Sequence, residues 1–391
     1  MDNYILNQMN EVFIQSWNEY YGTSFTTKQE VYKSLKEKDI TRMIKSDVKV
    51  ENEESGQLCF YTSGTSGHET FFKMKPEFLF GKYAKGLGQM YEELFNVTNH
   101  GLKTAICSFP IVGSPLGLKH LFALLELGVD VFPAGNRNFD FTPQQIVSAI
   151  EKKDVDMIIS RAPEVELYGR IAKKRGVDTE NVMAILMTGE VVGQNRIKHI
   201  EELFPNAIIR SVYGLTEINS GLFSCECGNY HFKRNGQTVV DLEQRKNSKY
   251  SDIYFTVLRP DIQTVRYSTR DVGTVVNDCS CSQGGAALNI KGRNSDEVAH
   301  DFFLLDLSEL LFDKGYEHNV FADITPEGEY HIIIKSSELI SDEDMQEIKS
   351  LVPTMKISNY LYDDADGYII RTKSCTLHRG VGKYEIPKAN Q

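Results

Sequence analysis

A short segment after residue 61 combines glycines and hydroxyl side chains in a way that suits phosphate binding. It consists of Thr62, Ser63, Gly64, Thr65, Ser66 and Gly67, and it follows the compact apolar run Leu58–Tyr61. Glycine lets a backbone approach a ligand closely, and hydroxyl groups donate hydrogen bonds to an anion. The segment is therefore a candidate cradle for the phosphates of a nucleotide, and a flexible surface loop is the alternative. It is not a Walker loop, because G-x-x-x-x-G-K-[ST] is absent from it.

A second candidate, Tyr213-Gly-Leu-Thr-Glu217, follows an apolar segment that predicts a buried strand, Ala207–Val212. Ligands bind at the carboxyl ends of strands in open parallel sheets. Tyr213 offers an aromatic face for a base, and Thr216 with Glu217 offers oxygen ligands for Mg²⁺.

Two further segments have polar residues at the end of a strand-like run. Arg266-Tyr-Ser-Thr-Arg-Asp271 ends in a lone carboxylate, which suits the two hydroxyl groups of a ribose. Ile290-Lys-Gly-Arg293 precedes the polar stretch Asn294–Glu297, which is typical of a junction between domains. A turn or a surface ion pair is the alternative for each segment taken alone.

The cysteines suggest a metal site. Cys225-x-Cys227-x₃-His231 lies upstream of Cys279-x-Cys281, and four thiols with an imidazole suit tetrahedral zinc. Such a site would join two turn-rich segments and take no part in chemistry; two unrelated pairs of buried thiols are the alternative. The isolated cysteines are expected to be small core residues, namely Cys59, Cys107 and Cys375.

The elements between these motifs predict an α/β fold. Predicted strands alternate with helices of about 10 to 15 residues, which implies right-handed crossovers and a mainly parallel sheet. The predicted strands are Lys103–Phe109, Val129–Phe132, Met157–Ile159, Val182–Met187 and Ala207–Val212.

Both ends of the chain differ from this middle part. Apolar periodicity predicts a helix over Asn3–Tyr20, and Thr27 is a candidate cap for a helix over Lys28–Lys36. From about Cys225 to Val276 the pattern changes to short strands and turns. The last part predicts a separate small α+β unit with strands at Asn319–Ile324, His331–Lys335 and Tyr368–Arg371 and a helix over Ser341–Leu351.

Composition excludes several classes of protein. The 391 residues carry a formal net charge of −11, which gives no electrostatic footprint for nucleic acid. The longest apolar stretches, such as Leu121–Leu125, are far shorter than the roughly 20 residues that cross a bilayer. Met1–Asn10 lacks the features of a signal peptide. We therefore expect a soluble, cytoplasmic protein without a nucleic-acid or membrane partner.

In this order, the motifs resemble those of the adenylate-forming superfamily of acyl- and aryl-CoA ligases, and the phenylacetate-CoA ligase branch most of all. The resemblance runs from about Thr26 to Lys383. It includes the Thr-Thr-Lys entry of a helix, a Gly-Leu-rich segment around Gly113–Gly117, the pair Gly189-Glu190, and Tyr213–Glu217, which matches its signature letter for letter.

The resemblance implies a large N-terminal domain over residues 1–293 with mainly parallel sheets, helices and a β-rich subregion. A hinge over residues 294–297 and a small mobile α+β domain over residues 298–391 would follow. Within this framework the loop Thr62–Gly67 would hold the β- and γ-phosphates of ATP. The adenine site would comprise Gly189, Glu190, Tyr213 and Gly214.

The same resemblance assigns the remaining roles. Thr216 and Glu217 would bind phosphate and Mg²⁺, Asp271 the ribose hydroxyls, and Arg293 would lie nearby at the start of the hinge. Lys383, at the end of a Gly-Val-Gly-Lys segment, would be the mobile lysine that stabilises negative charge on the α-phosphate. The acyl pocket would be walled by Phe109–Leu118 and Met187–Glu190.

For the metal site, the resemblance implies the zinc ligands Cys227, His231, Cys279 and Cys281, with Cys225 as a spare thiol. The chain departs from CoA ligases in Val298–Glu309, which contains no glycine, although these enzymes usually have one where the pantetheine arm passes.

The predicted function is ATP- and Mg²⁺-dependent activation of a small carboxylic acid, an aryl acid by resemblance, to an acyl-adenylate with release of pyrophosphate. The acyl group would then pass to the thiol of CoA or of a carrier protein. One alternative is transfer to an amine or to a protein cysteine, and another is a zinc-stapled nucleotide-binding pseudoenzyme. A homodimer is compatible with the sequence, which does not specify the oligomeric state.

Overall fold

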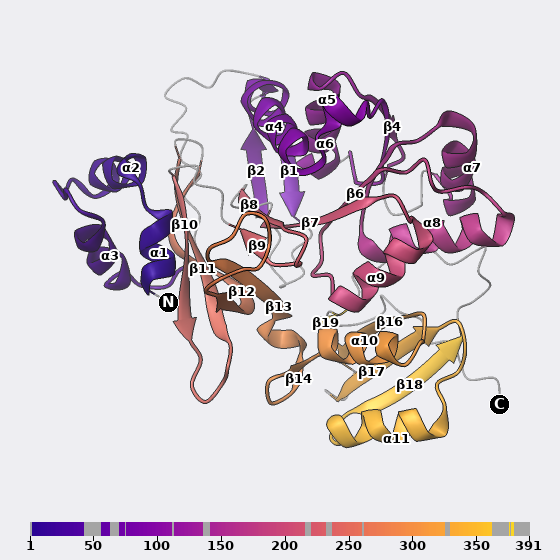
Figure 1. Cartoon of the computed structure of the whole chain (residues 1–391). Coiled ribbons are helices and arrows are strands. Elements are labelled where there is room, and N and C mark those ends of the chain that lie inside the picture. The colour runs from indigo at the N-terminus through magenta and orange to yellow at the C-terminus, as the bar shows by residue number, and fades with distance from the viewer. Residues whose placement is uncertain are drawn as a thin grey trace.

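Helices and strands alternate through the middle of the chain, as the sequence predicts (Figure 1). The computed structural model describes residues 2–42, 56–62, 70–74, 76–111, 113–135, 141–215, 220–231, 237–259, 262–324, 329–361, 375 and 377–378. None of the helices in these ranges combines the length and the apolar character that a membrane crossing requires.

One large sheet runs through the molecule. Among the described residues it contains eleven strands in the order β10-β11-β12-β13-β9-β8-β7-β6-β5-β3-β4. Pairing is parallel from β4 to β7 and antiparallel from β7 to β10. The strands are β3 (Thr104–Cys107), β4 (Asp130–Pro133), β5 (Met157–Ser160), β6 (Ala184–Thr188), β7 (Ile208–Leu215), β8 (Ser220–Ser224), β9 (Tyr230–His231), β10 (Thr238–Gln244), β11 (Ser251–Arg259), β12 (Ile262–Val276) and β13 (Ala287–Arg293).

Helices cover the parallel part on both faces. Successive strand residues point to opposite faces, so Ile158 packs with one helix layer while Met157 and Ile159 pack with the other. The first layer is α7 (Pro143–Lys153), α8 (Ala162–Arg175) and α9 (Gln194–Leu203); the second is α4 (Ala84–Phe95), α5 (Val97–His100) and α6 (Pro115–Glu126). A π-helical turn over Phe78–Tyr83 leads into α4, and the hairpin β1 (Leu58–Thr62) and β2 (Thr70–Met74) precedes it.

The N-terminal helices pack on the antiparallel end of the sheet, beside β10 and β11 (Figure 1). The single helix predicted over Asn3–Tyr20 is two helices, α1 (Asp2–Gln8) and α2 (Glu11–Tyr21). The chain breaks there because Asn10 caps α2, its side chain accepting a 3.0 Å hydrogen bond from the Phe13 backbone. The predicted helix over Lys28–Lys36 is confirmed as α3, with Thr27 and Glu30 forming a capping box.

The C-terminal unit has a core of its own. Its described strands pair in the order β18-β17-β16-β19, which are Lys356–Leu361, Tyr330–Ser336, His318–Ile324 and Leu377–His378. Helices α10 (Leu304–Asp313) and α11 (Asp342–Leu351) complete it, after a small hairpin of β14 (Glu297–Ala299) and β15 (Phe302–Phe303). The predicted hinge residues form a short 3₁₀ turn, Asn294–Asp296, and the start of β14. The strand predicted over Tyr368–Arg371 lies outside the described residues.

Gly117, in the first turn of α6, gives a test of how closely this helix packs against the segment that follows β3. A Cβ atom there would lie 2.6 Å from the carbonyl oxygen of Pro110 and 2.7 Å from that of Phe109. We expect Gly117→Ala to destabilise the protein by about 1–3 kcal/mol, because backbone atoms must shift. Gly86 in α4 has open space around it, so Gly86→Ala should leave stability unchanged or raise it by about 1 kcal/mol. Thermal unfolding followed by circular dichroism measures both; equal midpoints would contradict the packing described here.

Candidate functional site

A cleft opens at the carboxyl ends of β6 and β7, where the sheet changes from parallel to antiparallel pairing. It encloses about 700 Å³, part of it open to solvent. Its lining residues are Gly189, Glu190, Val191, Val212, Tyr213, Gly214, Leu215, Tyr230, Asp271, Lys291, Gly292, Arg293, Asp296, Leu305 and Cys375. Open α/β sheets bind ligands outside the carboxyl ends of their strands, which is where this cleft lies.

Residues predicted from separate sequence motifs meet in this cleft. Those that line it are Gly189, Glu190, Tyr213, Gly214, Asp271 and Arg293. Thr62 ends β1, whereas Ser63–Gly67, Thr216, Glu217 and Lys383 lie outside the described residues, so the predicted phosphate loop, Mg²⁺ ligands and mobile lysine stay predictions.

Asp271 lies at the centre of these contacts. Its Oδ2 atom accepts a 2.7 Å hydrogen bond from the Tyr213 hydroxyl, and its Oδ1 atom lies 3.7 Å from Nε of Arg293. Asp271 and Arg293 face each other because β12 and β13 pair at these residues. The structure therefore holds this carboxylate between a donor on the large sheet and a cation next to the predicted hinge.

The Tyr213 ring is more buried than a free platform for a base would be. Only 8% of the residue is exposed, and its ring packs against Tyr230 and Phe255 at centroid distances of 6.0 and 6.1 Å. Burial, and then the charge of Asp271, raise the pKa of Tyr213 well above its ordinary value. The hydroxyl therefore keeps its proton and donates to Asp271 at neutral pH.

A buried charge pair that the sequence analysis did not single out lies beneath the Gly189–Glu190 turn. Arg161, only 4% exposed, donates to Glu164 through Nη2 at 2.5 Å and Nε at 3.1 Å. Burial opposes its charge, yet the carboxylates of Glu164 and Glu190 raise the pKa of Arg161 above its usual value. Gly189 itself has φ +94°, a conformation that favours glycine.

Four predicted metal-ligand side chains converge on the other side of the β8–β9 hairpin. The candidate ligand atoms of Cys225, His231, Cys279 and Cys281 all lie within 4.8 Å of one another. The Sγ atoms of Cys225 and Cys279 are 3.7 Å apart, and Sγ of Cys281 is 3.1 Å from Nε2 of His231. We call these four residues the thiol–imidazole cluster.

The cluster differs from the ligand set that the family resemblance implied, because it contains Cys225, the spare thiol of that set, in place of Cys227. Phe223 pairs with His231, so Cys225, two residues after Phe223, lies on the same face of the hairpin as His231. Cys227 lies within the turn that follows and is partly exposed, with its Sγ atom 3.4 Å from the Ser280 hydroxyl.

One distance in the cluster agrees with tetrahedral zinc coordination. Two sulfur atoms that each lie about 2.3 Å from such an ion are about 3.8 Å apart. The separation of 3.7 Å between the Cys225 and Cys279 sulfur atoms agrees with this value. A nearby imidazole completes a donor set typical of zinc.

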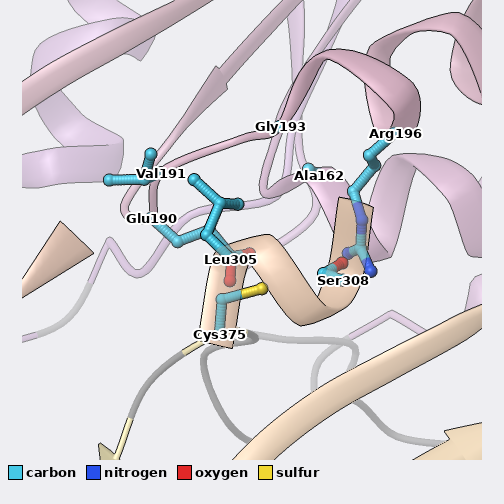
Figure 2. Close-up of a pocket in the computed structure, with 8 residues that line it drawn as sticks. All are labelled: Ala162, Glu190, Val191, Gly193, Arg196, Leu305, Ser308 and Cys375. Carbon is cyan, nitrogen blue, oxygen red and sulfur yellow. The ribbon is translucent and has the colours of Figure 1, made fainter. Parts of the chain in front are cut away.

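The small unit contacts α9 and α8 through polar groups. The Asn195 backbone N–H, in the first turn of α9, donates to Glu309 of α10 at 3.1 Å. Arg196, 4% exposed, donates to the backbone carbonyl of His318 at 2.8 Å. Figure 2 shows Arg196 and the Glu190–Val191 turn facing Leu305 and Ser308 of α10 around a small cavity, with Cys375 beside Leu305.

Comparisons with known proteins identify the architecture. The sequence matches no model of a known protein family and no curated protein. Among solved structures, 2-hydroxyisobutyryl-CoA ligase in its post-adenylation state, in complex with an acyl-AMP, aligns with a TM-score of 0.66 at 13% identity, over 97% of this chain and 87% of that chain. The chain has the adenylate-forming fold.

Other solved structures with this fold are similar over much of their length. A fatty acyl-adenylate ligase, from a study of the E. coli and L. pneumophila enzymes, has a TM-score of 0.53 at 14% identity, over 80% of this chain and 67% of that chain. O-Succinylbenzoate coenzyme A synthetase from Bacillus subtilis, in complex with AMP, has a TM-score of 0.50 at 14% identity, over 91% and 75%.

Two further structures of 2-hydroxyisobutyryl-CoA ligase, one in the thioesterification state and one in an open conformation, align with TM-scores of 0.55 and 0.54 at 13% identity.

Glu309 gives a test of the contact between α9 and the small C-terminal unit. Glu309→Ala removes the carboxylate that caps α9, which should cost about 0.5–2 kcal/mol and loosen the small unit. We expect a lower unfolding midpoint and a larger radius of gyration by small-angle X-ray scattering. Glu338→Ala, at an exposed residue of the same unit, is the control and should change neither. Indistinguishable scattering from the two variants would argue against a role for Glu309 in docking.

Proposed function

We propose that the chain is an AMP-forming adenylating enzyme that converts a carboxylic acid and ATP into an acyl-adenylate and pyrophosphate. The observation that carries this proposal is the convergence of Gly189, Glu190, Tyr213, Asp271 and Arg293 on one cleft. These residues come from separate motifs: Gly189, Glu190 and Tyr213 are predicted to line the adenine site, and Asp271 is predicted to bind the ribose hydroxyls with Arg293 nearby. The adenylate-forming fold supports the same reaction.

The residues of the cleft suggest how ATP would be held. The carboxylate of Asp271 would accept hydrogen bonds from the ribose hydroxyls, and the turn at Gly189 and Glu190 would lie along the adenine. A carboxylate oxygen of the acid would attack the α-phosphorus, and pyrophosphate would leave. Mg²⁺ would offset the charge on the phosphates; Glu217 with Thr216 would hold it, and Lys383 would stabilise charge on the α-phosphate.

For the acid, we propose a small carboxylic acid and an aryl acid first, because the sequence resembles the phenylacetate-CoA ligase branch. The structural neighbours are named for different acids, which include 2-hydroxyisobutyrate and O-succinylbenzoate. A test must therefore use a broad panel of acids.

For the acceptor, we propose a thiol, as in the neighbour solved with both acyl-AMP and CoA. Its sulfur would attack the acyl carbonyl carbon, and AMP would leave with the bonding electrons. A protein cysteine is the second candidate, because Cys375, predicted as an isolated core residue, is partly exposed and lines the cleft. The lack of glycine in Val298–Glu309, which forms β14, β15 and the start of α10, also favours an acceptor other than CoA.

We also propose that the thiol–imidazole cluster binds one structural zinc ion through Cys225, His231, Cys279 and Cys281. The cluster joins the β8–β9 hairpin to the segment between β12 and β13, and it includes none of the cleft residues. The ion would therefore stabilise the sheet and would not take part in catalysis.

The adenylation proposal predicts acid-dependent release of pyrophosphate that requires Mg²⁺. Asp271→Ala should weaken ATP binding by about 1.5–3 kcal/mol, or roughly 10- to 150-fold, because charge-assisted hydrogen bonds to the ribose are lost. Isothermal calorimetry measures this affinity, and Glu201→Ala on the exposed face of α9 is the control. If ATP binds but no acid in the panel releases pyrophosphate, the pseudoenzyme gains support.

Intact-protein mass spectrometry after the same reaction separates the two acceptors. Acylation of the chain that Cys375→Ser abolishes would identify the protein cysteine, and formation of acyl-CoA alone would identify CoA.

The zinc proposal predicts about one zinc ion per chain after a chelator wash. Cys225→Ala and Cys279→Ala should lose the ion and unfold at a lower temperature, because a structural ion contributes folding free energy. Cys227→Ala, the matched control two residues away, should keep the ion. Elemental analysis and thermal unfolding measure both properties. Retention of zinc by Cys225→Ala together with its loss from Cys227→Ala would restore the ligand set implied by the sequence.

A further inference from the structure

The backbone around Asp271 is held firmly. The Asp271 N–H donates to the Thr269 hydroxyl at 2.9 Å, and that hydroxyl donates to the Ile253 carbonyl at 2.8 Å. Arg270, the residue before Asp271, has a backbone φ of +63°, which is uncommon for residues other than glycine. These contacts fix the position of the Asp271 backbone.

The Tyr213 hydroxyl contacts the Asp271 side chain. It is 2.7 Å from Oδ2 of Asp271, whereas Nε of Arg293 is 3.7 Å from Oδ1, beyond the range of a hydrogen bond. The Tyr213 ring cannot readily move, because it is packed between Tyr230 and Phe255 in the core. A rigid donor thus contacts one oxygen of a carboxylate that lines the cleft.

We propose that Tyr213 is a positioning residue for nucleotide sugar recognition, because its hydroxyl holds the Asp271 carboxylate in the orientation that accepts the ribose hydroxyls. This inference rests on the proposed function of the cleft. It gives Tyr213 a role through its hydroxyl, in addition to the aromatic face that the sequence suggested. Without the hydroxyl, Oδ2 of Asp271 would lose this donor.

The state of the hydroxyl supports this role. Burial and the charge of Asp271 keep its pKa well above the ordinary value for tyrosine, so the proton stays on the oxygen. The hydroxyl is therefore protonated at neutral pH and remains a donor to Asp271. Phenylalanine at this position would keep the ring packing and remove only the donor.

The test compares the affinity for ATP with those for 2′-deoxy-ATP and 3′-deoxy-ATP, measured by calorimetry. The native protein should prefer ATP, because both sugar hydroxyls reach Asp271. Tyr213→Phe should lower ATP affinity by about 10-fold, the loss of one hydrogen bond to a charged group. Affinity for the deoxy analogues should fall less, so the preference for ATP decreases. A general structural defect would weaken all three nucleotides alike and leave their ratios unchanged.

Tyr230→Phe is the matched control. Its hydroxyl is 3.0 Å from that of Ser211, its ring packs against Tyr213, and it lines the same cleft. It should leave the nucleotide ratios unchanged, because its hydroxyl bonds to Ser211 and not to Asp271. Equal ratios in native protein and Tyr213→Phe, or an equal decrease in both tyrosine variants, would overturn the proposal.

A second variant protects the test against misfolding. Asp271→Glu keeps the charge but moves the carboxylate away from the 2.7 Å contact. Its preference for ATP should also decrease, and a native ratio in this variant would overturn the proposal even if Tyr213→Phe fails to fold. If the native protein binds ATP, a failed ratio test rejects only the role of Tyr213; if it does not bind ATP, the proposed function itself fails and this inference fails with it.

Discussion

The antiparallel pairing of β7 with β8 is the constraint on which the site depends. Parallel strands β3 to β6 deliver their carboxyl ends to one edge, and β7 then turns back through β8. This reversal lets the sheet continue through β9 and β13 to β12, which carries Asp271. The cleft therefore forms where parallel and antiparallel pairing meet, and Leu305 and Cys375 of the small unit complete its lining. Replacing β8 with another parallel strand would require a long crossover and would remove Asp271 from Tyr213.

Charged groups at the contact of the small unit with α8 and α9 are buried to an unusual degree. Glu166 is fully buried, and its carboxylate lies 3.7 Å from Arg196 and 4.0 Å from Arg170. Arg196 in turn contacts the small unit at His318 and Asn319. Removing one partner of such a group leaves a buried charge, which costs much more than the pair contributes. The contact is thus specific in geometry while its net stabilisation is small.

Most helices and strands could be predicted from local sequence patterns, whereas the arrangement of the site could be predicted only in part. The strands and helices between residues 103 and 212 were predictable because their apolar periods and lengths agree with their buried faces. The meeting of Tyr213 with Asp271 was implied only by family resemblance, since 58 residues separate them and strand pairing brings them together. The break at Asn10 was missed because the apolar period continues across it.

Other differences have identifiable physical causes. Cys225 and Cys227 look equivalent in sequence, because both are an even number of residues from Phe223; they differ in the structure because Cys227 lies in the turn after the strand, with its Sγ atom 3.4 Å from the Ser280 hydroxyl. Helix α10 was not predicted, since its first turn is capped by Asp306 from within the helix and not by a preceding serine or threonine. Arg161 does not belong to a recognisable sequence motif. Its partner Glu164 looks like an ordinary helical residue in the sequence, and only the structure shows that both side chains are buried.

The large sheet has one place where two neighbouring strands, β9 and β13, share very few paired residues, and the thiol–imidazole cluster lies beside it. In the described part of the chain, β9 pairs with β13 at a single position, Tyr230 with Leu288, whereas neighbouring strands pair over longer registers. Cys225 and Cys279 are 54 residues apart in the chain, so any bond between them closes a long loop. Such a bond lowers the conformational entropy of the unfolded chain, so it raises the free energy of the unfolded state and stabilises the folded one. A bond through these four side chains, such as the proposed zinc ion would supply, would therefore hold the two halves of the sheet together where they share the fewest paired residues.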